Sequence, residues 1–268
     1  MSSWEKLKEK GNKKYKNKNY HTAIELYTDG ISFDPEQDVL YANRSLCYKA
    51  LENYRQSLND LSKALGINTT VKNLKRKYEI LIILGQFPEA ENAIQKCCNI
   101  EPREYSHKSD LTGVKNYIMQ FNKFHEYYAK ENMVKVEDIA GSLVKVCTGN
   151  FEIKQAYLEA LISNNKLDEA TVFWTQKLSQ TERGSDEFIY LICKVFYYQG
   201  NYEKAKVSMK RLIQRCNDNT RYNKLLHIVN NIEKEKDAAN AIFKSGKYND
   251  AIDAYGKLLE LDPLNNIF

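Results

Sequence analysis

Three cations and two amides in the first third of the chain are the side chains whose types and spacing suggest a binding site. Lys8 and Asn12 are four residues apart, Lys72 and Arg76 are four residues apart, and Asn43 lies between the two pairs. Residues four apart in a helix share one face. All five side chains donate hydrogen bonds, and none is a carboxylate. If they converge, they would bind an anion, and Arg76 could hold a carboxylate by two parallel hydrogen bonds.

The smallest peptide that would use all five donors carries an acidic side chain beside its free C-terminal carboxylate. We therefore expect this site to capture a chain end. A second Lys-x-x-x-Asn pair, Lys236 and Asn240, occurs near the other end of the sequence. It predicts a partial second site, which would need two further repeats after Phe268 to supply the remaining donors.

The elements that position these residues follow from an internal period of roughly 34 residues, which is typical of stacked helical hairpins. Small, large apolar and proline residues recur in phase, most clearly in the first, third and last repeats: Ala23, Tyr27 and Pro35; Ala90, Ile94 and Pro102; Ala251, Tyr255 and Pro263. No single hairpin could bury both of its apolar faces, so the hairpins must stack. The spacing is similar to that of tetratricopeptide repeats. It predicts an all-α helix-turn-helix solenoid of about seven repeats, wound as a right-handed superhelix.

Repeat numbering places the five donors on one surface. Positions 2, 5, 6 and 9 of the first helix of each repeat line the concave face of such a solenoid, and the donors fall at these positions in the first three repeats. Lys236 and Asn240 fall at positions 5 and 9 of the last repeat. The sequence thus predicts one groove containing Lys8, Asn12, Asn43, Lys72 and Arg76.

The same residues resemble the two-carboxylate clamp of tetratricopeptide co-chaperones, whose signature is K-x-x-x-N, N-R-[SA] and K-x-x-x-R on the first, third and fifth helices. Here the middle motif is Asn43-Arg44-Ser45, and the match covers residues 4 to about 104. The resemblance implies a non-catalytic adaptor. Its groove would hold the C-terminal Glu-Glu-Val-Asp tail of the cytosolic seventy- and ninety-kilodalton heat-shock chaperones.

Two clamp blocks separated by an array without a clamp resemble the repeat part of the J-domain co-chaperones that contain tetratricopeptide repeats. No His-Pro-Asp tripeptide occurs in this chain. We expect a clamp module over residues 1–104, a linker or the start of a capping helix over 105–116, a non-clamp array over 117–231, and the first repeat of a second clamp over 232–268.

The composition of the chain argues against several classes of function. The net charge is +5, the six cysteines lack Cys-x-x-Cys spacing, and the four histidines are isolated. No apolar run approaches the ~20 residues of a membrane span. We therefore expect a soluble cytoplasmic protein with reduced thiols, no cofactor or metal, no enzymatic activity, and neither nucleic acid nor membrane as a partner.

Two alternatives to the adaptor function stay open at this point. The chain could be a scaffold subunit that binds an internal segment of another protein, with a client polypeptide as a further candidate partner. An enzyme is possible only if a catalytic domain follows Phe268. Dependence on a free peptide C-terminus distinguishes the adaptor from the scaffold.

Overall fold

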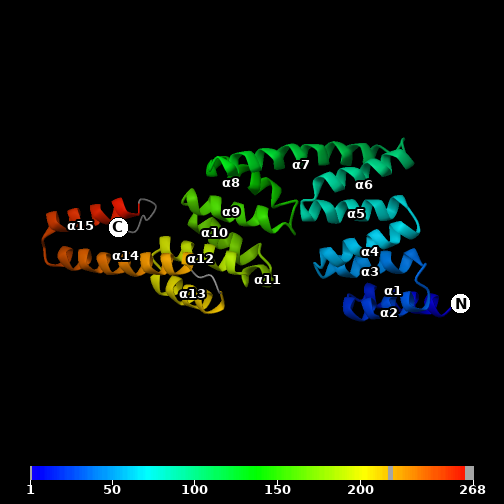
Figure 1. Ribbon diagram of the computed structural model, residues 1–268, viewed down its shortest axis with the longest axis horizontal. Coiled ribbons are helices and arrows are strands. Elements are labelled where there is room, and N and C mark those ends of the chain that lie inside the picture. Colours follow the sequence, from blue (N-terminus) through cyan, green and yellow to red (C-terminus); the bar gives the residue numbers. More distant parts are fainter. Residues whose placement is uncertain (1, 217–219, 263–268) are drawn as a thin grey trace. The chain divides into compact units, whose positions relative to one another are not determined.

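The computed structural model describes residues 2–216 and 220–262, and every regular element in these ranges is a helix (Figure 1). The helices are α1 (Ser3–Lys16), α2 (Tyr20–Phe33), α3 (Asp38–Ala50), α4 (Tyr54–Ile67), α5 (Val71–Leu84), α6 (Phe87–Ile100), α7 (Tyr105–Ala129), α8 (Met133–Leu143), α9 (Phe151–Ser163), α10 (Leu167–Gln176), α11 (Gln180–Arg183), α12 (Asp186–Tyr198), α13 (Tyr202–Arg215), α14 (Thr220–Lys244) and α15 (Tyr248–Leu261). The predicted all-α fold is confirmed. Pro263, the proline of the last repeat, lies outside the described residues.

Apart from the four-residue α11, these helices follow one another as seven pairs, each joined by a short turn. One residue in every one of these turns has a positive φ: Lys18, Glu52, Gly85, Glu131, Asn165, Gly200 and Gly246. The left-handed conformation reverses the chain direction between the two helices of a hairpin, and glycine adopts it at the least cost. The turns therefore mark seven hairpins in register, although only three of them use glycine.

Two of the first helices are longer than the others. α7 and α14 each contain 25 residues, whereas the first helices of the other hairpins contain 13 or 14. Residues 105–116, where the sequence loses its repeat phase, form the beginning of α7. The repeat phase is lost in this stretch because one helix of the repeat series is longer than its counterparts.

The chain divides into two compact units, one of Met1–Glu126 with Ser142–Asn150 and the other of Tyr127–Gly141 with Phe151–Phe268. In the first unit, α1 to α6 form successive antiparallel pairs, and each pair packs on the next (Figure 1). Its core includes Tyr27, Leu40, Leu81 and Phe87, all fully buried. In the second unit, α12 to α15 enclose a separate apolar cluster.

Local signals in the sequence explain where the helices that carry the predicted site begin and end. A capping box joins Ser2 and Glu5 at the start of α1, and the Thr70 side chain accepts the Asn73 backbone N–H at the start of α5. Such caps satisfy backbone donors that a first turn leaves unpaired. Pro35 and Pro102 follow the ends of α2 and α6, as the sequence predicts.

Among the residues that the structure describes, no helix is both long enough and apolar enough to cross a bilayer.

Candidate peptide-binding site

The five predicted donors lie on the first helices of the first three hairpins. Lys8 and Asn12 are on α1, Asn43 is on α3, and Lys72 and Arg76 are on α5. All three helices belong to the first unit, where α1 contacts α3. Repeat stacking thus places the donors on neighbouring helices, although up to 68 residues of sequence separate them.

A direct hydrogen bond connects the two amides. Asn43 Nδ2 donates to Asn12 Oδ1 at 3.0 Å, and the same oxygen accepts a hydrogen bond from the Tyr27 hydroxyl at 2.8 Å. The carbonyl oxygen of Asn12 is therefore occupied from two directions. Because an amide nitrogen carries two N–H groups, Asn12 Nδ2 and the second N–H of Asn43 are the donors left to a ligand.

Arg76 is a half-buried cation whose partners are weak. Its Nη1 lies 3.5 Å from the Ala42 carbonyl oxygen and 3.4 Å from Asn73 Oδ1, both at the long limit of a hydrogen bond. Burial lowers the pKa of its guanidinium, an effect that the charge of Glu79 partly offsets. Within the described part of the chain, no carboxylate forms an ion pair with Arg76. A cation that has lost water without gaining a counter-ion favours binding of an anion.

Lys8 and Lys72 add two positive charges nearer to solvent. The Lys8 ammonium lies 5.1 Å from the centre of the Trp4 ring, a cation–π distance. Lys72 is exposed on the first turn of α5. Neither lysine is paired with a carboxylate in the described ranges, whereas Lys75 of α5 lies 3.7 Å from Asp110. The two lysines can therefore contribute their charge to a ligand.

The second residue of the Asn43-Arg44-Ser45 motif has a structural role. The Arg44 guanidinium donates to both carboxylate oxygens of Asp60, at 2.7 and 2.8 Å, and to the Thr28 hydroxyl at 2.9 Å. Ser45 is buried and donates to the Ala42 carbonyl. Within this motif, Asn43 is therefore available for binding, Arg44 holds α3 against α2 and α4, and the Ser45 hydroxyl bonds within its own helix.

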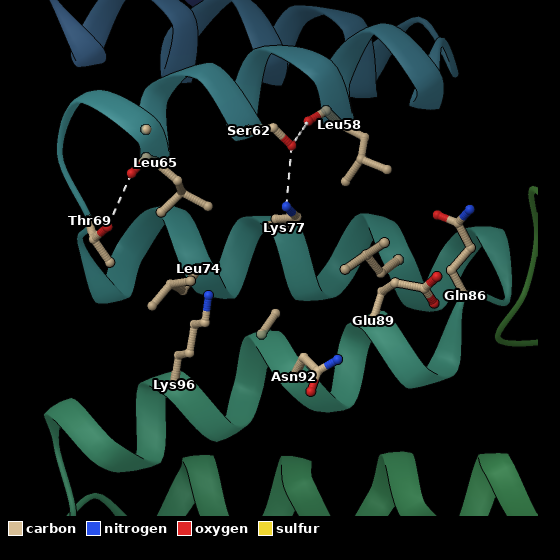
Figure 2. A pocket seen from close by; sticks show the side chains of 13 residues that line it. Leu58, Ser62, Leu65, Thr69, Leu74, Lys77, Gln86, Glu89, Asn92 and Lys96 are labelled. Atoms are coloured by element: carbon tan, nitrogen blue, oxygen red, sulfur yellow. Dashed lines mark hydrogen bonds between the residues drawn. The ribbon is translucent and has the colours of Figure 1, made fainter.

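The opposite side of α5 borders a separate hollow of about 540 Å³ (Figure 2). Its lining includes Leu74, Lys77 and Leu81 of α5, and Lys77 donates to the Ser62 hydroxyl at 3.2 Å. At about 100° per residue, Lys72 and Arg76 point to the other side of the helix from these three residues. None of the five predicted donors lines the hollow, so α5 separates it from the candidate site.

The predicted partial second clamp lies on α14, in the second unit. The Tyr255 hydroxyl donates to Asn240 Oδ1 at 2.6 Å, which repeats the relation between Tyr27 and Asn12 at the same spacing of 15 residues. The Lys236 ammonium lies 5.4 Å from the centre of the Tyr202 ring, and burial lowers its pKa. The tyrosine–asparagine hydrogen bond at the first Lys-x-x-x-Asn pair is thus reproduced at the second.

The repeat pattern predicts Tyr27 and Tyr255 only as large apolar residues and does not predict the role of their hydroxyl groups. The signal was present, because a tyrosine follows the asparagine of each Lys-x-x-x-Asn motif by 15 residues. Burial raises the pKa of the Tyr27 hydroxyl, so it remains a protonated donor. Trp4, beneath the Lys8 ammonium, was also missed.

Cys47, Cys97, Cys147 and Cys193 are buried free thiols. Among the described residues, no group of three or more histidine, cysteine, aspartate and glutamate side chains is arranged to hold a metal ion.

The structure is a helical-repeat scaffold in which three cations and two amides lie on neighbouring helices of the first unit, and comparisons with known proteins show which repeat it resembles. The tetratricopeptide repeat family model matches residues 39–70, which include α3 and α4. The chain is 24% identical to the DnaJ homolog subfamily C member 7 homolog of Dictyostelium discoideum, over 97% of this chain and 49% of that protein. It is 32% identical to protein unc-45 homolog B of Xenopus laevis over 48% of this chain and 14% of that protein.

The chain has the fold of a tetratricopeptide repeat solenoid. A solved structure with the same fold, the P58(IPK) TPR domain, superposes with a TM-score of 0.71 at 18% identity, covering 99% of this chain and 75% of that one. The predicted helical-repeat fold is confirmed by this likeness and by the family match. The chain spans about half the length of its DnaJ-homolog relatives, and less of the unc-45 homolog.

Proposed function

We propose that the first unit binds the C-terminal end of a partner protein through a two-carboxylate clamp, and that the chain acts as a co-chaperone adaptor. The ligand would be the Glu-Glu-Val-Asp tail of the seventy- and ninety-kilodalton heat-shock chaperones. The observation that carries the proposal is Arg76, a half-buried guanidinium with no carboxylate partner in the described ranges, beside two amides whose N–H groups remain available.

The donor set fits such a ligand in number and kind. A C-terminal carboxylate together with one acidic side chain offers four oxygens, and the three cations and two amides offer at least as many donors. The planar fork of Arg76 suits one carboxylate, and Lys8 and Lys72 supply charge to either. The likeness to the DnaJ-homolog relative, which spans nearly the whole chain, supports an adaptor rather than an enzyme.

Calorimetric titration with a peptide ending in Met-Glu-Glu-Val-Asp tests the proposal. We expect a dissociation constant on the order of micromolar. Binding should be lost when the peptide C-terminus is amidated and when Arg76→Ala removes the guanidinium. Arg55→Ala is the matched control, because Arg55 is exposed on α4 of the same unit and outside the site. This variant should bind like the natural chain.

The competing function is that of a scaffold that binds an internal segment of a partner. Binding that is indifferent to amidation, or no binding at all, would contradict the clamp and favour this alternative. Salt adds a second criterion, because clamp affinity should fall as ionic strength screens the charges.

A further inference from the structure

We propose that the Tyr27 hydroxyl is a positioning residue for the clamp, because it fixes the orientation of the Asn12 amide and thereby decides whether the site presents a donor or an acceptor. The inference rests on the proposed function and deepens it. Tyr27 would not contact the ligand, and its effect would pass through Asn12.

The Tyr27 ring packs against a glycine of α1. A Cβ atom built on Gly11 would lie 2.6 Å from Cε1 and 2.9 Å from Cζ of Tyr27, so the tyrosine ring lies directly against the bare backbone of α1. This close approach brings the ring of a residue on α2 beside Asn12, the next residue of α1. The hydroxyl then reaches Asn12 Oδ1 at 2.8 Å while the ring itself is 1% exposed.

Two orientations of the Asn12 amide can be compared. In the observed one, its oxygen accepts from Tyr27 and from Asn43, and its nitrogen remains for a ligand. If the amide rotated by half a turn, the Tyr27 hydroxyl could only accept from Asn12, its own O–H would lose its acceptor, and the Asn43 N–H would face an N–H group. A buried donor without an acceptor is costly. The tyrosine hydroxyl therefore favours the orientation that can bind a carboxylate.

The rotated orientation would weaken the proposed site directly. It would point the Asn12 carbonyl oxygen toward a ligand carboxylate, and two oxygen acceptors repel each other.

The same hydrogen bond, from Tyr255 to Asn240, occurs in the second unit. There Gly11 has no glycine counterpart, because Ala239 precedes the asparagine. The hydrogen bond is thus associated with the Lys-x-x-x-Asn motif in both of its occurrences.

The test is Tyr27→Phe, which keeps the ring and removes only the hydroxyl. We expect affinity for the Met-Glu-Glu-Val-Asp peptide to fall roughly five- to tenfold, the effect of one hydrogen bond. Tyr197→Phe is the control, because it removes a tyrosine hydrogen bond to Asp262 in the second unit, outside both predicted clamps. It should leave peptide affinity unchanged.

A double-mutant cycle separates positioning from a general structural effect. In an Asn12→Ala background, Tyr27→Phe should have no further effect on affinity, because the amide that it orients is absent. Circular dichroism melts of each variant check folding. As a second measurement, the Asn12 side-chain amide signals in a nitrogen–proton correlation spectrum should shift when peptide is added to the natural chain, and should shift less in Tyr27→Phe.

The outcomes are distinct. If the natural chain binds the peptide and Tyr27→Phe binds equally well, the positioning role is wrong and the clamp stands. An equal loss from Tyr27→Phe in the natural and Asn12→Ala backgrounds would also overturn it, since the effect would not pass through the amide. If the natural chain does not bind the peptide, the proposed function fails and the positioning role fails with it.

Discussion

The guanidinium of Arg44 holds the carboxylate of Asp60 by two hydrogen bonds, and the two side chains are only 13% and 3% exposed. The pair joins α3 to α4 within the second hairpin. Removing one member of a buried pair leaves the other charge without compensation. We therefore expect Asp60→Ala to lower the free energy of unfolding by about 3 kcal/mol, measured by urea denaturation.

The control for this variant is an ion pair at the surface of the same unit. Lys49 and Glu79 lie 2.6 Å apart, but their side chains are 34% and 51% exposed. Solvent screens such a pair, so Glu79→Ala should cost less than about 1 kcal/mol. Equal effects from Asp60→Ala and Glu79→Ala would contradict the structural role of Arg44.

Arg76 and Lys72 should respond differently to exchange of one cation for the other. Arg76→Lys keeps the charge but loses the planar fork, and we expect roughly tenfold weaker binding of the acidic peptide. Lys72→Arg keeps a charge at an exposed position and should change affinity by less than about threefold. Titration calorimetry of the two variants makes the comparison, and the opposite ranking would refute the assignment of the bidentate contact to Arg76.

Asn12→Asp probes the polarity of the groove with almost no change in shape. An aspartate can still accept hydrogen bonds from Tyr27 and Asn43, but it places a second oxygen where the amide nitrogen was. We expect little change in melting temperature and a loss of peptide affinity greater than tenfold, because a carboxylate would face the ligand carboxylates. Asn12→Ala, which removes the donor without adding charge, should lie between the natural chain and Asn12→Asp.

Gly11→Ala should destabilise the first unit, since its new Cβ would overlap the buried Tyr27 ring. Overpacking of this kind typically costs about 1–3 kcal/mol. Gly66→Ala is the matched control, because a Cβ at that position near the end of α4 would meet no atom within 4 Å. That variant should be neutral or slightly stabilising, since alanine favours helix more than glycine. Urea denaturation of both variants checks the contrast.

Buried thiols predict a loss of stability in alkali. Burial raises the pKa of Cys193 from its ordinary value of 9.0 to about 12, so the folded protein retains a proton that the unfolded chain releases. The stabilisation is complete below pH 9.0 and is lost as the pH rises toward about 12. Linkage gives a loss of about 1.4 kcal/mol between pH 8 and pH 10 from this one thiol.

Cys193→Ala isolates this contribution, because the variant has no thiol to titrate at that position. Its stability relative to the natural chain should improve by about 1.4 kcal/mol when urea denaturation is repeated at pH 10 instead of pH 8. A difference that is independent of pH would show that the thiol titrates normally in the folded protein.

The sequence by itself determined the fold class and the candidate surface. A period of roughly 34 residues predicts stacked hairpins, and the 3.6-residue period within each helix decides which side chains share a face. These two periods were sufficient to place Lys8, Asn12, Asn43, Lys72 and Arg76 on neighbouring helices of one unit. They left open whether residues 105–116 form a linker or the start of a helix, and these residues form the beginning of α7.

Only the tertiary structure decided what each polar side chain does. Arg44 and Arg76 both belong to clamp motifs, but Arg44 is neutralised by Asp60 from the next helix, whereas Arg76 forms no ion pair with a carboxylate in the described ranges. Likewise, the Tyr27 hydroxyl donates to Asn12 of the preceding helix while the tyrosine ring packs against Gly11. Helical periodicity fixes the direction of a side chain, but the partner that it meets depends on how closely the next helix packs.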